Sequence, residues 1–272
     1  MKSSLTLISF NIWDLPVPTN RTRHARVREI ISYLKRLDPD VICLQEAWDP
    51  VHRRHIHDEL GRGRYQAPAN ENIASRWYPF FNGTGGLLTL SKYPVASEAF
   101  VPFKGLTFSL TDWLGNKGFL ESKLETPWGD LTIINTHVCH LSSTARQPLV
   151  RRRFSQFSRL LDHTQQSAGQ PLVMAGDFNE DDIMEQPQFA ARLERSDMAH
   201  PASTASASVY TYRHDNPFVT DLTPSPDSSC RFDYFFVRGL DRLRLRVERY
   251  EPLYVDPAMS DHDPVILTLS QA

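Results

Sequence analysis

The chain has 272 residues, of which 40% are hydrophobic and 23% are charged, with 30 Lys and Arg against 32 Asp and Glu. A chain of this length buries a large core and needs neither disulfides nor a structural metal to fold, and we expect one domain over residues 1–272. The net charge of −2 argues against a protein dedicated to nucleic acids, because phosphate contacts usually leave a basic excess.

The cysteines and the N-terminus argue against a disulfide-rich, zinc-binding or secreted protein. Cys43, Cys139 and Cys230 are odd in number and lack the paired spacing of a disulfide framework or a zinc site. The apolar stretch that starts after Ser4 is interrupted at Asn11, so it is too short for a signal peptide. No run approaches the roughly 20 apolar residues of a membrane span. The sequence therefore predicts a cytoplasmic protein, which we expect to be a monomer.

The first part of the chain predicts a strand, a helix and a second strand. These elements are a strand at 5–10, a helix that begins after a capping Asn20 and has Val27, Ile30, Ile31 and Leu34 on its apolar stripe, and a strand at 41–44. This order leaves open whether the two strands run parallel.

The pattern then changes to short β-branched or Thr-rich runs separated by turn residues, which indicates antiparallel hairpins. The predicted elements are strands at 86–91, 95–103, 118–124 and 131–136, a helix with an apolar stripe from Leu149 to Leu161, a strand at 171–175, a helix around 184–193, a long loop at 200–229, and strands at 232–237, 243–250 and 265–269. The economical interpretation is one α/β domain with a large, mostly antiparallel sheet system.

A polar run follows the strand at 171–175. Gly176, Asp177 and Asn179 place a carboxylate and an amide at the edge of a sheet. Such groups are costly inside a protein unless they are hydrogen-bonded, paired or bound to a metal. Asp and Asn also cap helices, so this run alone leaves a site and a helix cap equally open.

Several other strands end in, or lead from, polar residues of the same kind. They are Asn11, Glu46, His137, Asp233 and the run Asp261-His262-Asp263. Each has a structural explanation by itself: a turn, a solvated edge, a core histidine, or a salt bridge from Asp233 to Arg231. Together they predict a site, because loops at one end of a sheet system converge. Oxygen ligands suit Mg²⁺ and histidines beside carboxylates supply a base, so the chemistry indicated is magnesium-assisted hydrolysis of a phosphate ester.

Six motifs occur in an order that resembles the endonuclease/exonuclease/phosphatase superfamily over about residues 5–269. They are Ser9-Phe10-Asn11, Leu44-Gln45-Glu46, Asn135-Thr136-His137, Gly176-Asp177-Phe178-Asn179, Phe232-Asp233-Tyr234 and Ser260-Asp261-His262-Asp263-Pro264. The resemblance implies an α/β fold of the DNase-I type, a four-layer sandwich in which two packed, mixed, mostly antiparallel β-sheets are flanked by helices.

The resemblance also implies roles for these residues. Asn11 and Glu46 would form the metal site for Mg²⁺, with Mn²⁺ or Co²⁺ as substitutes, and Asp261 would complete the metal or water network. His262 would be the general base, oriented by Asp233. Asp177 would position the attacking water, and Asn179 and His137 would contact the non-bridging phosphate oxygens.

Other segments are similar to the neutral sphingomyelinase branch of the superfamily. They are Asn11 to Pro16, Gly83 to Leu87, and Thr111 to Gly118, which contains Asp112 and Lys117. Lys117 would then face the substrate phosphate, and Asp112 would hold or release it. The alternative is a hairpin turn with an exposed lysine. The aromatic run 77–81 fits either contact with a membrane interface or a satellite core cluster.

The sequence therefore predicts a Mg²⁺-dependent phosphodiesterase that releases a head group such as phosphocholine from a phospholipid, with peripheral membrane contact. A nuclease is the alternative, for which the basic triplet 151–153 is weak support because it also fits a solvated helix face. A binding module that has lost catalysis is disfavoured, because every motif keeps its acids, amides and histidines.

Overall fold

A computed structural model of the chain describes residues 3–15, 20, 22–61, 65, 83–103, 115–140, 147–202, 204, 209–220 and 229–272. Within these residues the strands form two mixed sheets of five strands each. The first sheet has the order β3-β2-β1-β10-β9 and contains β1 (Ser4–Asn11), β2 (Val41–Gln45), β3 (Leu88–Ser91), β9 (Leu245–Pro252) and β10 (Val265–Gln271). The second has the order β4-β5-β6-β7-β8 and contains β4 (Val95–Pro102), β5 (Gly118–Thr126), β6 (Gly129–His137), β7 (Leu172–Asp177) and β8 (Asp233–Arg238).

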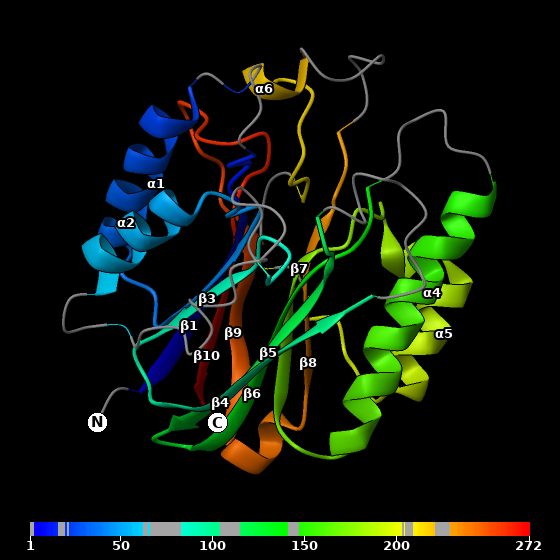
Figure 1. Cartoon of the computed structure of the whole chain (residues 1–272). Helices are drawn as coiled ribbons and strands as arrows, with labels where there is room; N and C mark the ends of the chain where they lie inside the picture. Colours follow the sequence, from blue (N-terminus) through cyan, green and yellow to red (C-terminus); the bar gives the residue numbers. More distant parts are fainter. Residues whose placement is uncertain are drawn as a thin grey trace.

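Helices cover the outer face of each sheet, which gives the four-layer sandwich that the sequence predicts (Figure 1). The described helices are α1 (Arg23–Leu37), α2 (Pro50–Gly61), α4 (Gln147–Thr164), α5 (Pro187–Arg195) and the single turn α6 (Pro217–Thr220), with 3-10 turns at Gln165–Ser167, Ile183–Glu185 and Leu240–Leu243. None of the helices in the described part of the chain has the length and apolar character needed to cross a lipid bilayer.

Three apolar clusters hold the layers together. Ile8 of β1 packs in one cluster with residues of α1 and α2, and Met174 of β7 packs in another with residues of α4 and α5. Leu7 and Ile133 belong to the cluster between the sheets. The alternation of side chains along each strand explains this division, since successive residues point to opposite faces.

The strand pairing places several strand ends at one edge of the sandwich. β1 and β2 run parallel, which answers the question that the sequence leaves open, and β6 and β7 also run parallel. The remaining pairs are antiparallel. The carboxyl ends of the parallel strands and the start of β8 therefore lie together at one end of the sandwich.

Two local predictions differ from the structure, and one helix was missed. Asn20 does not cap α1, whose N-cap is Thr22; its amide instead donates to the Trp13 carbonyl at 2.7 Å. The helix α2, which follows the second strand, was not predicted. The triplet 151–153 is not wholly a solvated face, because Arg153 is buried and pairs with Glu180 at 2.6 Å.

Candidate active site

The space between the sheets is apolar at one end of the strands and polar at the other. In β1 the inner face carries Leu5 and Leu7, then Ser9 and Asn11, and the other central strands change in the same way toward the same end. The polar positions are Asn11 in β1, Gln45 in β2, Asn135 and His137 in β6, Asp177 in β7 and Asp233 in β8, all of them buried. Gln45 joins the two sheets, because its amide donates to the Asn135 side-chain oxygen at 2.8 Å.

The backbone around Asp177 is specialised. Gly176 has φ 151°, and a Cβ there would lie 2.0 Å from the carbonyl oxygen of Thr136, so glycine is required for β7 to lie so close to β6. The Asn179 backbone N–H donates to Oδ1 of Asp177 at 2.8 Å, and Asn179 has φ 51°. Helix α5 begins only at Pro187. Helix capping, the alternative for Asp177 and Asn179, is therefore wrong.

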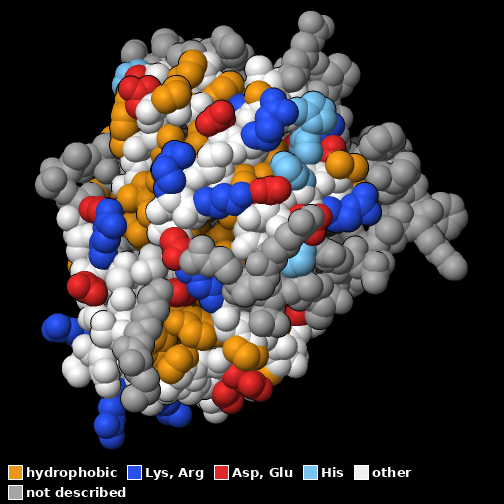
Figure 2. Space-filling view, turned by 90° about the vertical axis from the view of Figure 1, so that its left-hand side faces the viewer, with side chains coloured by type: hydrophobic (Ala, Val, Ile, Leu, Met, Phe, Trp, Pro, Cys, Tyr) orange, Lys and Arg blue, Asp and Glu red, His pale blue; other side chains and the backbone are white. Residues whose placement is uncertain are grey.

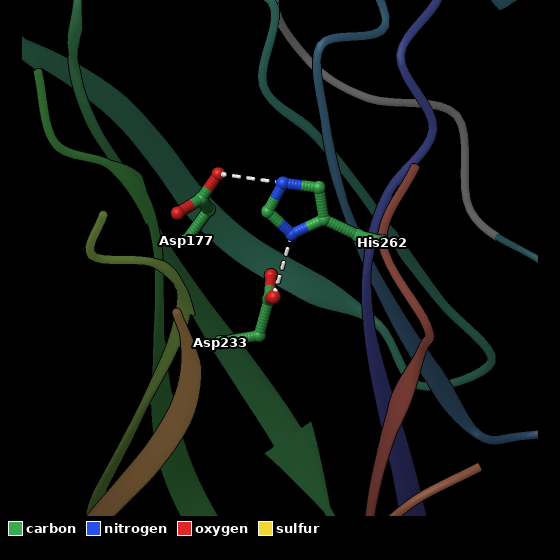
Figure 3. A group of neighbouring side chains, drawn as sticks. All are labelled: Asp177, Asp233 and His262. Carbon is green, nitrogen blue, oxygen red and sulfur yellow. Dashed lines mark hydrogen bonds and ion pairs between the residues drawn. The ribbon is translucent and has the colours of Figure 1, made fainter. Parts of the chain in front are cut away.

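A buried histidine lies between two carboxylates (Figure 3). Nδ1 of His262 is 2.7 Å from Oδ2 of Asp233, and its Nε2 is 3.7 Å from Oδ2 of Asp177. One ligand atom from each of these three residues lies within 4.8 Å of the others, so the group is compact enough to hold a cation. Asp233 pairs with His262, so the alternative of a salt bridge from Asp233 to Arg231 is not the arrangement found.

The charges in this group shift the pKa values of its members. Burial lowers the pKa of His262, but the neighbouring Asp233 and Asp177 carboxylates outweigh burial and hold that pKa well above its ordinary value. Burial raises the pKa of Asp177, yet the charges of His262, His137 and Lys117 outweigh it and lower the pKa. Asp177 is therefore a carboxylate, and His262 takes up a proton readily.

Asn11 connects this group to a further acid. Its amide donates to Oδ2 of Asp177 at 2.9 Å and to Oε1 of Glu46 at 3.3 Å, while its side-chain oxygen accepts the Trp13 backbone N–H at 3.1 Å. Glu46 is not a solvated edge residue, since its side chain is 20% exposed. Burial and the Asp261 carboxylate raise the pKa of Glu46 to about 7. Unlike Asp177, Glu46 thus lacks enough positive charge nearby to be fully ionised at neutral pH.

Asp261 is tied to the same network through its neighbour. Ser260 donates to the Asn11 backbone oxygen at 2.7 Å, and its Oγ lies 3.1 Å from Oδ1 of Asp261. Burial raises the pKa of Asp261. The next acid in the motif, Asp263, turns away and pairs with Arg213. Asp261 therefore belongs to the site and Asp263 supports the loop that carries it.

Lys117 lies inside the site and not on an exposed turn. It is buried, and its Nζ is 2.8 Å from Nε2 of His137 and 3.0 Å from the Val138 carbonyl oxygen. Burial and the Lys117 charge lower the pKa of His137 well below its ordinary value, so His137 is neutral. Nε2 of His137 is also 3.4 Å from Oδ2 of Asp177. Asp112, the predicted partner of Lys117, lies outside the described residues.

Sequence reasoning missed two residues that shape the site. His140 places its Nδ1 3.0 Å from Oδ1 of Asn179, and Asn179 donates through Nδ2 to the Val138 oxygen at 3.1 Å. Tyr212 packs edge-on against His262, with ring centroids 5.1 Å apart. His140 follows His137 by three residues, which is a signal in the sequence; Tyr212 comes from the loop at 200–229, which gives no such signal.

A family model described as "Endonuclease/Exonuclease/phosphatase family" matches residues 8–262. The chain belongs to this family. Its curated relatives include "Inositol phosphosphingolipids phospholipase C" of Schizosaccharomyces pombe, 27% identical over 183 residues, a match that covers 64% of this chain and 41% of the relative. They also include "Sphingomyelinase C 2" of Leptospira interrogans, 22% identical over 247 residues, which covers 80% of this chain and 38% of the relative. The chain thus spans about two fifths of the length of these relatives.

Several solved structures share the fold of this chain. Sphingomyelinase C from Streptomyces griseocarneus has a TM-score of 0.74 at 21% identity, with all of both chains covered. A mutant of beta toxin from Staphylococcus aureus with bound magnesium ions has a TM-score of 0.72 at 19% identity, covering 99% of this chain and 100% of that one. TDP2 of D. rerio, complexed with a single-strand DNA product, has a TM-score of 0.72 at 17% identity, covering 99% of this chain and 100% of that one. Relatives by sequence and structure thus include sphingomyelinases, as the sequence predicts.

Proposed function

We propose that this member of the family is a Mg²⁺-dependent phosphodiesterase of the sphingomyelinase type, which hydrolyses the head-group ester of a phospholipid and releases phosphocholine from sphingomyelin. The observation that carries the proposal is the 2.7 Å contact between His262 Nδ1 and Asp233. That contact turns Nε2 of His262 toward Asp177, where a base is needed to activate water.

The proposed reaction is an in-line attack of water on phosphorus. In its neutral form, which a cation bound nearby would favour, His262 takes the proton from the water through Nε2, while Asp233 fixes the tautomer of the imidazole and stabilises its charge once it is protonated. Asp177, which lies between His262 and Asn11, orients the water. A positioned base of this kind contributes roughly 10²–10⁴ in rate.

A second group of residues receives the phosphate. Lys117, Asn179 and the neutral His137 line the end of β6 and β7, where N–H donors can bind the non-bridging oxygens and stabilise the charge of the transition state. His140 holds the Asn179 side chain through its oxygen, so the amide nitrogen, which already donates to the Val138 oxygen, has one further hydrogen to donate. In this assignment Lys117 is the substrate-binding cation.

The carboxylates of the site fit a hard divalent cation. The pKa of Glu46 is raised to about 7 by burial and by Asp261, so a cation here would relieve an electrostatic cost that the protein otherwise bears. Glu46 and Asp261 would hold the ion, with Asn11 beside it to fix the carboxylates of Glu46 and Asp177. Bound Mg²⁺, or Mn²⁺ or Co²⁺ in its place, would neutralise charge on the phosphate and on the leaving oxygen.

The compact trio of Asp177, Asp233 and His262 is a second possible position for a cation. We assign this trio to proton transfer, because the Nδ1 atom of His262 is already engaged with Asp233 at hydrogen-bond distance. The oxygen ligands of Glu46 and Asp261 also suit Mg²⁺ better than an imidazole nitrogen does.

The choice of a phospholipid substrate is supported by the names of the sequence relatives, which are phosphosphingolipid and sphingomyelin hydrolases. Two other predictions for this substrate, the role of Asp112 and the membrane contact of the aromatic run 77–81, lie outside the described residues. The nuclease alternative draws support from the TDP2 likeness, which shows the fold alone.

A head-group release screen tests the proposal. The protein is incubated with vesicles of sphingomyelin, phosphatidylcholine or an inositol phosphosphingolipid, and in parallel with plasmid DNA, each with Mg²⁺ and with EDTA. We expect Mg²⁺-dependent release of phosphocholine from sphingomyelin, and none in EDTA. Plasmid nicking without release from any lipid would replace the proposal with the nuclease alternative, and nicking of that kind would weaken steeply as salt rises.

A further inference from the structure

A second cluster of histidine and carboxylate side chains lies where α1 and α2 begin. Nδ1 of His52, in the first turn of α2, is 2.7 Å from Oδ1 of Asp14. The other ring nitrogen of His52, Nε2, is 2.6 Å from Nδ1 of His24, in the first turn of α1. None of these three residues belongs to the catalytic group described above.

Burial divides the three residues into an inner and an outer part. Asp14 is fully buried and His52 is 6% exposed, whereas His24 is exposed. Figure 2 looks onto the face covered by α1 and α2 and shows histidine side chains gathered at its upper right. The two histidine nitrogens that meet therefore lie near the surface, with the carboxylate behind them.

This arrangement is the one by which proteins prepare a histidine to bind a metal. A metal-binding imidazole commonly donates its other N–H to a carboxylate, which fixes the tautomer and makes the free nitrogen a stronger ligand. The 2.7 Å bond from His52 to Asp14 does this, because it places the proton on Nδ1 and leaves Nε2 as an acceptor directed at His24.

We propose that His24 Nδ1 and His52 Nε2 bind a transition-metal ion of the zinc or copper class, with Asp14 as the carboxylate that orients His52. Two imidazole nitrogens that share a tetrahedral zinc ion at about 2.0–2.1 Å each stand about 3.3 Å apart. The present separation is 2.6 Å, so the rings must part by less than an ångström, which a side chain as exposed as His24 can accommodate.

The proton balance of binding is simple. In the absence of metal, the short contact is a hydrogen bond in which His24 donates from Nδ1 to Nε2 of His52. On binding, the ion replaces that proton, and neutral His24 carries its proton on Nε2 instead, so neither imidazole needs to change its charge. Water completes the coordination.

The arginines around the site offset its carboxylates, so the ligand atoms and not the surrounding charge select the ion. Arg23 Nη1 lies 3.3 Å from Oδ1 of Asp14 and 2.6 Å from Oδ2 of Asp49. Arg23 Nη1 is also 3.4 Å from Nδ1 of His52, and the Arg26 charge acts on Asp14 as well, so two guanidinium groups offset the two carboxylates. Imidazole ligands select zinc, copper and nickel over magnesium and calcium, so we expect Mg²⁺ not to compete for this site.

Copper and zinc titrations of the metal-stripped protein test the proposal. Cu²⁺ is added in steps and followed by electron paramagnetic resonance, which counts nitrogen ligands, and Zn²⁺ is added while the thermal midpoint of unfolding is followed. We expect one ion per chain with two nitrogen ligands, and a rise in the midpoint with Zn²⁺. Both signals should disappear in His24→Ala and persist in His262→Ala, because the catalytic histidine is not a ligand here.

Two further variants sharpen the result. His214→Ala removes another exposed histidine and serves as the matched control. Asp14→Asn should weaken Zn²⁺ affinity by about 10–100-fold without changing the number of ions, as expected for loss of a carboxylate that orients a ligand. Unchanged stoichiometry and affinity in His24→Ala, or a copper signal lost in His262→Ala, would overturn the proposal, whatever the protein does with phosphodiesters.

Discussion

Nδ1 of His262 and Oδ2 of Asp233 lie 2.7 Å apart, although 29 residues separate them in the chain. Both side chains are buried, and the loop before β10 brings the histidine to the first residue of β8. This contact gives His262 a defined tautomer, with its second nitrogen directed at Asp177. The predictions below rest on it and on the charges around it.

Replacing the carboxylate of Asp233 by an amide should abolish most of the activity. Asp233→Asn keeps the shape of the side chain but no longer stabilises the charged imidazole, so we expect kcat to fall by about 10²–10⁴. Head-group release under saturating substrate measures this change. Asp241→Asn, at an exposed position, is the control and should remain fully active. Full activity in Asp233→Asn would mean that His262 is not the base.

Removing the charge of Glu46 should stabilise the protein when no divalent cation is present. The pKa of Glu46 is raised from 4.5 to about 7 in the folded state, so ionising Glu46 lowers the free energy of unfolding. This cost is absent below pH 4.5 and complete above pH 7. The side chain is 20% exposed and therefore partly screened. At pH 8 we expect Glu46→Gln to have a higher urea midpoint than the wild type and a free energy of unfolding that is greater by roughly 1–3 kcal/mol. Near pH 4 the two proteins should be equally stable.

Addition of Mg²⁺ should make the wild type more stable than Glu46→Gln. The wild type gains stability with the logarithm of the ion concentration above its dissociation constant, while Glu46→Gln lacks a ligand and gains less. If Mg²⁺ raises the urea midpoint of both proteins equally, then Glu46 does not hold the ion.

The pairing of His262 should also make the wild type lose stability relative to its variant as pH rises, here because a favourable charge interaction is lost. Its pKa is raised in the folded state, so its contribution is fully present below about pH 6.5 and is lost as pH rises through the raised pKa. We therefore expect the wild type to exceed His262→Gln in unfolding free energy at pH 6 and to lose that advantage in alkaline buffer. Urea titrations without divalent ions at both pH values measure the difference. An advantage that grows with pH would contradict the assignment.

Lys117 should control both the phosphate site and the titration of His137. The Lys117 ammonium, 2.8 Å from His137 Nε2, contributes with burial to lowering the pKa of that histidine. Lys117→Met should raise the pKa of His137, followed by NMR of the ring nitrogens, and should lower kcat by about 10²–10³ as one donor to the phosphate is lost. Lys123→Met, exposed on β5, is the matched control and should change neither quantity.

The sequence predicts most elements of the fold because their apolar periodicity is strong, and α2 shows why it misses one. In α2 the buried side chains include His52 and Arg53 beside Ile56 and Leu60. Arg53 is accommodated by donating to the Leu87 carbonyl oxygen at 2.8 Å. A helix that buries polar side chains through hydrogen bonds from distant loops carries too weak an apolar stripe to be predicted from spacing.

The site shows the same division between local and long-range information. The strand ends at Asn11, Glu46 and Asp177 could be predicted, because each follows an apolar run. For Asp233, the residues alone leave a salt bridge to Arg231 open, and only the family resemblance implies the pairing with His262, because that pairing depends on the approach of the β10 loop to β8. Likewise, only the folded chain shows that Lys117 is buried beside His137.

Hydrolysis of sphingomyelin vesicles in water enriched in ¹⁸O tests the central claim most directly. Mass spectrometry of the released head group reports which bond has broken. We predict phosphocholine carrying one ¹⁸O atom on phosphorus, formed only with Mg²⁺ and lost in both EDTA and His262→Ala. Unlabelled phosphocholine, or equal release by His262→Ala, would contradict attack on phosphorus by water that His262 activates.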